Sequence, residues 1–240
     1  MIRITVLAAL LATACATGRL QEARTLPDDG ARTLPADRNV AVQYVALGDS
    51  TVEGVGATRA DFNYVNRLHG RLRAVYPEAR VANLGVGGAT SADVLRRQLA
   101  RAIELRPHLI TLSIGPNDIT TRVPLTTYER NLDAILGRLR DETTAVIVVN
   151  LIPDLVLTPR FRDHREREAL DRQTMAFNDA LERRGRAYGA ELVDLYAASQ
   201  REVPARPELI GGDGYHPSDV GYARWAELMW MGVQARMASR

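Results

Sequence analysis

Between Val40 and Met237 the chain alternates short apolar runs with segments of helical periodicity, and this alternation restricts the fold more than any other feature. The runs are rich in Val, Ile and Leu with few intervening polar residues, as in strands buried on both faces, which is typical of a parallel sheet between two helical layers. We expect strands at residues 40–47, 81–84, 109–114, 145–151 and 191–195. We expect helices at residues 64–76, 91–105, 126–140, 166–186 and 218–237. The sequence therefore predicts a single α/β domain over residues 40–240, with three α/β/α layers and a five-stranded parallel sheet of the flavodoxin-like kind.

Residues 1–16 have the pattern of an export signal. Arg3 precedes an apolar stretch, and the small residues Ala12, Thr13 and Ala14 follow it as a cleavage site. Cys15 comes next, so the segment resembles a bacterial lipobox, in which the cysteine is lipidated and becomes the mature N-terminus. This pattern predicts export, with a possible membrane tether through lipidated Cys15, and secretion after simple cleavage is the alternative.

Residues 17–39 are predicted to form a flexible linker. The segment contains Gly and Pro breakers and mixed charges, and it has neither helical nor strand periodicity. The sequence Ala-Arg-Thr-Leu-Pro occurs twice within it, at residues 23–27 and 31–35. Five residues are too few to form a repeat architecture.

The charged residues exclude several classes of protein. There are 31 basic and 29 acidic residues, and every basic residue is arginine. Without lysine the chain has no P-loop lysine, no Schiff base and no lysine general base. A net charge of +2 gives little attraction for a polyanion, so we expect no nucleic-acid partner. A single cysteine permits no internal disulfide.

Four polar or glycine-rich segments follow predicted strands or precede the last helix. Ligand and catalytic sites of open parallel sheets lie at the carboxyl ends of the strands, where these segments would meet. They are Gly-Asp-Ser-Thr at 48–51, Asn-Leu-Gly-Val-Gly-Gly-Ala-Thr at 83–90, Gly-Pro-Asn-Asp at 115–118 and Asp-Gly-Tyr-His-Pro at 213–217. Each segment alone is common in proteins, but all four in this order form a specific pattern.

With these four segments the chain resembles the SGNH hydrolases, the GDSL-type esterases and lipases, over residues 40–237. The resemblance implies that Ser50 is the nucleophile and that His216 and Asp213 complete a catalytic triad. It also implies that Gly88 and Asn117 join the backbone N–H of Ser50 as donors to an oxyanion. No metal or organic cofactor is implied.

The residue types of the last segment suit this chemistry. A serine hydroxyl is a poor nucleophile unless a base accepts its proton, and histidine performs this role near neutral pH. Asp213 precedes His216 by three residues, so on a tight turn its carboxylate can reach the imidazole and fix the tautomer. The other histidines and three further acidic residues are expected to be structural: His69, His108, His164, Asp49, Asp118 and Asp194. For Asp49 and Asp118 we expect hydrogen bonds that stabilise their own turns.

The predicted function is that of an exported serine esterase or lipase. Within the family the same residues serve thioesters, lysophospholipids and O-acetylated carbohydrates, and acyl transfer to an alcohol is a close variant. A non-catalytic carbohydrate- or lipid-binding module on the same fold is the alternative from another class. The apolar segment 152–161 after the fourth strand either walls an acyl pocket or packs on the protein's own surface.

Overall fold

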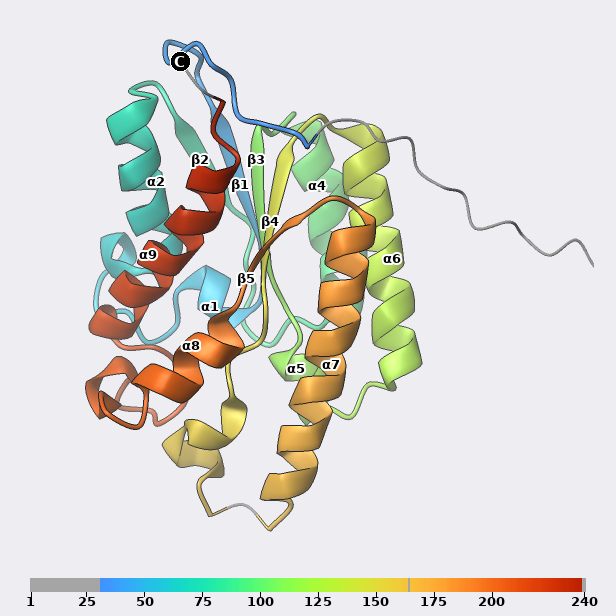
Figure 1. The fold of residues 1–240 in the computed structure, drawn as a ribbon, viewed down its shortest axis with the longest axis vertical. Coiled ribbons are helices and arrows are strands. Elements are labelled where there is room, and N and C mark those ends of the chain that lie inside the picture. The colour runs from blue at the N-terminus through green and yellow to red at the C-terminus, as the bar shows by residue number, and fades with distance from the viewer. Residues whose placement is uncertain (1–30, 164, 239–240) are drawn as a thin grey trace, which may run out of the picture. The chain divides into compact units, whose positions relative to one another are not determined.

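A parallel sheet in the order β2-β1-β3-β4-β5 forms the centre of the fold (Figure 1). The computed structural model describes residues 31–163 and 165–238. The strands are β1 (Gln43–Gly48), β2 (Arg80–Asn83), β3 (Leu109–Ser113), β4 (Val146–Asn150) and β5 (Glu191–Val193). Every neighbouring pair is parallel, so all five carboxyl ends lie at one edge of the sheet.

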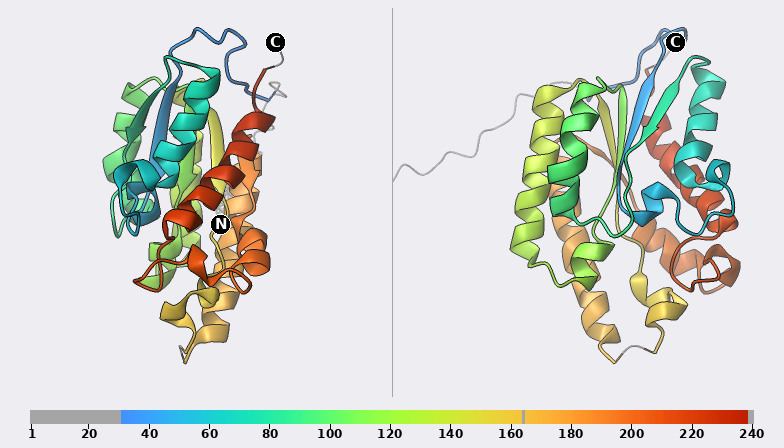
Figure 2. Two further views of the ribbon diagram at one scale, coloured as in Figure 1. Left: turned by 90° about the vertical axis from the view of Figure 1, so that its left-hand side faces the viewer. Right: turned by 180° about the vertical axis from the view of Figure 1, so that it is seen from behind.

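Helices cover both faces of this sheet. In chain order they are α1 (Ser50–Glu53), α2 (Tyr64–Val75), α3 (Ser91–Asp93), α4 (Leu99–Glu104), α5 (Pro116–Thr120), α6 (Leu125–Glu142), α7 (Arg167–Ala187), α8 (Leu195–Glu202) and α9 (Asp219–Ala235). Figures 1 and 2 show α2 and α9 on one face and α4, α6 and α7 on the other. The predicted three-layer α/β/α fold with a five-stranded parallel sheet is confirmed.

The predominantly apolar runs are explained by the two cores that the sheet separates. Successive side chains of a strand point to opposite faces. In β4, Ile147 and Val149 belong to the cluster under α6 and α7, whereas Val146 and Val148 belong to the cluster under α2 and α9. Both faces of the strand are thus buried, which is why no polar alternation occurs.

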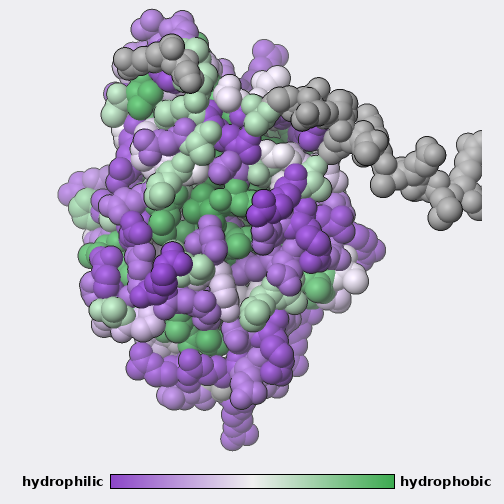
Figure 3. Space-filling view, in the orientation of Figure 1, coloured by the Kyte–Doolittle hydropathy of each residue, from purple (hydrophilic) through white to green (hydrophobic). Residues whose placement is uncertain are grey.

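The terminal helix α9 buries an apolar stripe against the sheet. Met229 and Val233 are fully buried, whereas Met231, off that stripe, is 63% exposed. The surrounding face is largely hydrophilic with smaller apolar areas (Figure 3). No helix within the described residues is long and apolar enough to cross a membrane.

The helix predicted for residues 91–105 differs in the structure. A π-helical segment, Val94–Gln98, separates α3 from α4. The N-cap is Thr90, which forms a capping box with Asp93. Ser91 is turned inward and fully buried, because its hydroxyl donates to Asp118 at 2.5 Å.

The flexible linker predicted for residues 17–39 does not hold over 31–38. Leu34 is 1% exposed, and its N–H donates to the carbonyl of Arg236 at 2.7 Å beside the end of α9. The Arg38 guanidinium donates to the Tyr76 hydroxyl and to the carbonyl of Ala238. The folded unit therefore begins at Ala31, before Val40. Residues 17–30 of the predicted linker, the predicted signal peptide 1–16 and Cys15 lie outside the described residues.

Candidate active site

Ser50 begins α1 directly after β1, at the carboxyl edge of the sheet. Gly48 makes the turn possible, because its φ is +148° and a Cβ there would lie 2.0 Å from the carbonyl oxygen of Ser113. Asp49 is the N-cap, and its Oδ1 accepts hydrogen bonds from the backbone N–H of Thr51 at 3.0 Å and from its hydroxyl at 2.9 Å. The predicted turn-stabilising role of Asp49 is confirmed.

Asp49 is also a buried charge beside the candidate nucleophile. Its side chain is 1% exposed, and burial raises its pKa to about 6. The hydrogen bonds from Thr51 and the positive charge that His216 can carry counteract this rise. Asp49 therefore titrates in a pH range in which an exposed aspartate is already ionised.

His216 lies in a loop that closes on itself before α9. Ile210 and Pro217 form an antiparallel bridge, and the Gly211 N–H donates to the His216 carbonyl at 2.7 Å. Ser218 then caps α9, with its side chain accepting from the Gly221 N–H. The bridge and the cap hold the loop from both sides.

The structure brings Ser50, His216 and Asp213 together as the sequence predicts. The Ser50 Oγ lies 2.9 Å from His216 Nε2, and His216 Nδ1 lies 2.5 Å from Asp213 Oδ2. The other oxygen, Asp213 Oδ1, accepts from the backbone N–H groups of Tyr215 and His216 at 2.9 and 3.0 Å. Burial raises the pKa of Asp213, but these hydrogen bonds outweigh it and hold the pKa below its usual range. An ionised carboxylate only accepts, so Nδ1 carries the proton and Nε2 is free to accept from Ser50.

Gly88 lies in the loop after β2, and both of its neighbours are held by side chains of other segments. The Glu53 carboxylate accepts from the Gly87 N–H at 2.6 Å. On the other side, Asn117 Nδ2 donates to the Ala89 carbonyl at 2.9 Å. Gly88 itself has a φ of +76°, a conformation that L side chains rarely adopt. The structure thus connects the segments of Ser50, Gly88 and Asn117, as predicted.

Asp118 also connects the segment after β2, which holds Gly88, with the segment of Asn117. It is fully buried and accepts from the Ser91 N–H at 2.8 Å and from its hydroxyl at 2.5 Å. Ser91 Oγ in turn accepts from Asn131 Nδ2 at 2.9 Å. Burial raises the pKa of Asp118, and the Ser91 hydrogen bonds oppose the rise. The expectation of bonds within its own turn is wrong, because its partners come from a distant segment.

Gln98 is a supporting residue that the sequence did not reveal. Its side-chain amide accepts from the Gly48 N–H at 2.9 Å and donates to the Gly48 carbonyl at 2.8 Å. It belongs to the π-helical segment, where the phase of the helix changes. A pattern based on 3.6 residues per turn cannot locate such a contact.

The residues predicted to be structural have structural partners where they are described. His69 Nε2 lies 2.9 Å from the Ala79 carbonyl, and His108 Nδ1 accepts from the Gln43 N–H at 3.0 Å. Asp194 is the N-cap of α8. His164 lies outside the described residues.

The segment 152–161 packs against the protein's own core, where Ile152, Leu155 and Phe161 are buried, and it also lines a cavity. Ile152, Leu155 and Leu157 line a cavity that Ser50 and His216 also line. Arg160 donates its N–H to the Gly214 carbonyl in the histidine loop. The segment therefore both walls the cavity and supports the loop that carries His216.

Fold and site together define an α/β protein with a serine–histidine–aspartate arrangement at the carboxyl edge of a parallel sheet. The profile of the GDSL-like lipase/acylhydrolase family matches residues 46–224. The chain belongs to this family, and it is a hydrolase of ester bonds that acts on small-molecule esters.

Individual relatives agree with this assignment. The chain is 26% identical to an acetylxylan esterase of Geobacillus stearothermophilus, over 73% of this chain and 83% of the relative. It is 25% identical to the esterase TesA of Pseudomonas aeruginosa, over 83% of this chain and 92% of that one. The crystal structure of a TesA protein superposes with a TM-score of 0.67 at 23% identity, covering 81% of this chain and 99% of TesA, which shows the shared fold.

Proposed function

We propose that the protein hydrolyses carboxylic esters through an acyl-enzyme on Ser50. His216 Nε2 accepts the hydroxyl proton while Ser50 Oγ attacks the carbonyl carbon. Asp213 holds the imidazole in the required tautomer and stabilises the imidazolium. The observation that carries the proposal is the continuous chain of hydrogen bonds from Ser50 through His216 to Asp213, at 2.9 and 2.5 Å.

The remaining steps use the same base. The tetrahedral intermediate expels the alcohol, which takes the proton from His216 Nε2 and leaves the acyl group on Ser50 Oγ. Water then attacks the acyl carbon and gives a proton to His216. Collapse of the second intermediate returns that proton to Ser50 Oγ and releases the carboxylic acid.

In our proposal the oxyanion receives hydrogen bonds from the backbone N–H groups of Ser50 and Gly88 and from the Asn117 amide. The Ser50 N–H belongs to the first turn of α1, where N–H groups have no acceptor within the helix. Asn117 uses one amide hydrogen to hold Ala89, which orients the other. A preorganised donor of this kind contributes about 10²–10³-fold to turnover.

The test is hydrolysis of p-nitrophenyl butyrate by the full chain and its variants. Ser50→Ala and His216→Ala should each lower kcat by about 10⁴-fold or more while the circular dichroism spectrum stays unchanged. His69→Ala is the matched control, since it removes an imidazole on α2 that hydrogen-bonds to the Ala79 carbonyl. Turnover by Ser50→Ala within tenfold of the unmodified protein would refute the proposal.

We further propose export, with lipidation of Cys15, on the strength of the pattern in residues 1–16. Expression in a bacterial host fed a palmitate analogue tests it. The full chain should be labelled and sediment with membranes, and Cys15→Ser should lose the label. Label retained by Cys15→Ser would contradict lipidation at this residue.

A further inference from the structure

A cavity of about 120 Å³ lies directly beside Ser50 and His216. Its walls come from residues 152–158 after β4, from α8 and from the first turns of α9. Most of its exposed lining surface is apolar, with aliphatic side chains such as Ile152, Leu155, Leu157, Leu195, Leu209 and Leu228. An aliphatic space next to the reactive hydroxyl favours a group that is itself apolar.

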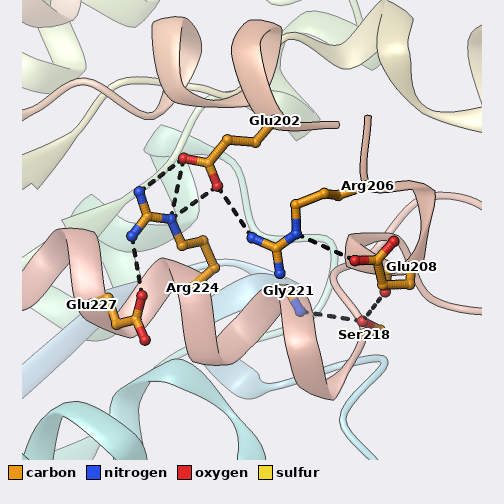
Figure 4. A network of polar contacts seen from close by, with 7 residues as sticks. All are labelled: Glu202, Arg206, Glu208, Ser218, Gly221, Arg224 and Glu227. Carbon is orange, nitrogen blue, oxygen red and sulfur yellow. Dashed lines mark hydrogen bonds and ion pairs between the residues drawn. The ribbon is translucent and has the colours of Figure 1, made fainter. Parts of the chain in front are cut away.

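The charged side chains that α8 and α9 add to this lining bind each other. Arg224 donates from Nη2 to Glu202 Oε1 at 2.8 Å and from Nε to Oε2 at 2.9 Å. Figure 4 shows Arg206 also directed at Glu202, and Glu227 paired with Arg224. A charged ligand would have to compete with these bonds. An uncharged chain would also gain nothing by covering this ion pair, because removing water from paired charges costs free energy.

Asp154, a third charged group of the lining, is also occupied. Its Oδ1 accepts from the Val156 N–H at 3.1 Å, and its Oδ2 accepts from Gln200 Nε2 at 3.3 Å. Both oxygens of the Asp154 carboxylate therefore already accept a hydrogen bond from the protein.

We propose that this cavity binds the acyl chain, and that the preferred substrates are esters of unbranched, uncharged aliphatic acids of about four to eight carbons. The inference rests on the proposed function, since it takes Ser50 as the site of acylation. An apolar cavity of about 150 Å³ in another protein holds benzene, a six-carbon molecule. A cavity of about 120 Å³ should therefore take a chain of roughly five carbons beyond the carbonyl. An acetyl group leaves most of it empty, and a palmitoyl group exceeds it.

The length of the acyl chain should then determine kcat/KM. Each methylene that enters apolar surroundings should raise kcat/KM by about fourfold until the cavity is full. For the full chain acting on p-nitrophenyl esters, we expect kcat/KM to rise from acetate to hexanoate and to fall beyond octanoate.

A pair of neighbouring substitutions on α8 tests the location. Ala198 lines the cavity and Ala197 does not. Ala198→Leu should place a larger side chain in the cavity and lower the hexanoate-to-acetate ratio of kcat/KM at least tenfold. Ala197→Leu, the matched control, should leave that ratio within about twofold.

The outcomes separate this inference from the proposed function. Serine-dependent hydrolysis with acetate as the best ester, or an unchanged ratio in Ala198→Leu, overturns the acyl cavity and leaves the esterase proposal standing. If the unmodified protein cleaves no ester, the esterase proposal itself fails. If Ala198→Leu does not fold, the hexanoate-to-acetate ratio of kcat/KM of the unmodified protein tests the inference. A ratio below one would then overturn it.

Discussion

The two halves of the site are held in place by different means. In the acid–base half, Asp213 and His216 are three residues apart, and the carboxylate also binds two N–H groups of its own turn. In the oxyanion half, the parts come from segments distant in sequence. Gly87 is held by Glu53, 34 residues away, and Ala89 is held by Asn117, 28 residues away. Local geometry therefore suffices for one half, while the other depends on tertiary packing.

This difference predicts how each half responds to substitution. Removing a group from the acid–base half removes chemistry and should produce the largest losses. In the oxyanion half the losses should be graded, from the donor itself to the side chains that position it.

The largest effect that bears on this comparison is expected for Asp213→Asn, which should lower kcat by about 10⁴-fold. The amide cannot stabilise the imidazolium, although it nearly preserves the shape of the site. Initial rates with p-nitrophenyl butyrate provide the measurement. Asp219→Asn is a control of the same chemistry, because Asp219 binds Thr58 at the start of α9. A loss below tenfold for Asp213→Asn would show that the Asp213 carboxylate does not support His216 in acid–base catalysis.

Asn117→Ala should lower kcat by about 10²–10³-fold with little change in KM, because an oxyanion donor acts mainly in the transition state. The measurement is a full kinetic analysis with the same ester. Asn66→Ala also removes an amide that binds a backbone carbonyl, but on α2, and should leave kcat unchanged. Equal effects of the two substitutions would assign Asn117 to general stability instead.

Glu53→Ala should lower kcat by about tenfold, since a hydrogen bond to a charged group contributes about 1.5 kcal/mol or more. The loss should fall on kcat and leave KM unchanged, because Glu53 acts through the Gly87 N–H and not on the substrate. Glu53→Gln retains an acceptor oxygen and should recover most of the rate. If Glu53→Gln is as impaired as Glu53→Ala, the hydrogen bond is not what positions the loop.

The smallest effect on activity is expected for Asp49→Asn. This substitution should instead change how the free energy of unfolding depends on pH. The native pKa of about 6 lies above that of an unfolded aspartate, so between about pH 4 and 6 the native state binds more protons than the unfolded state. The contribution of Asp49 to the free energy of unfolding is therefore fully present below about pH 4. This contribution, about 3 kcal/mol, is lost as the pH rises through the window.

Urea unfolding of the unmodified protein and of Asp49→Asn at several pH values measures this contribution. The variant retains an acceptor for Thr51 and should lack the Asp49 part of the decline. Asp118 and Asp154 also have raised pKa values, so the difference between the two curves is the informative quantity. Parallel curves from pH 4 to 7 would contradict the raised pKa.

The contact within the acid–base half could be predicted because its information is local. An aspartate three residues before a histidine on a turn makes a contact between their side chains feasible. The roles of Ser50, His216 and Asp213 follow from the family resemblance, as do those of Gly88 and Asn117. The supports of the last two, Glu53 and the Ser91–Asp118 bond, depend on which side chains face each other across the folded chain, which periodicity does not report.

Two segments show the same limit in the fold. Gln98 reaches Gly48 only because a π-helical segment changes the phase of the helix. The segment 31–38 has no periodicity, yet it is ordered by the burial of Leu34 and by the partners of Arg38. In both cases the structure is decided by a distant partner and not by the local sequence.

The central claim is that Ser50 carries the acyl group, and covalent trapping tests it most directly. The full chain would be treated with a fluorophosphonate and its peptides mapped by mass spectrometry. One adduct, on Ser50, is the predicted result, with no adduct in Ser50→Ala and strongly slowed labelling in His216→Ala. An adduct on another residue, or labelling that persists in Ser50→Ala, would contradict the account.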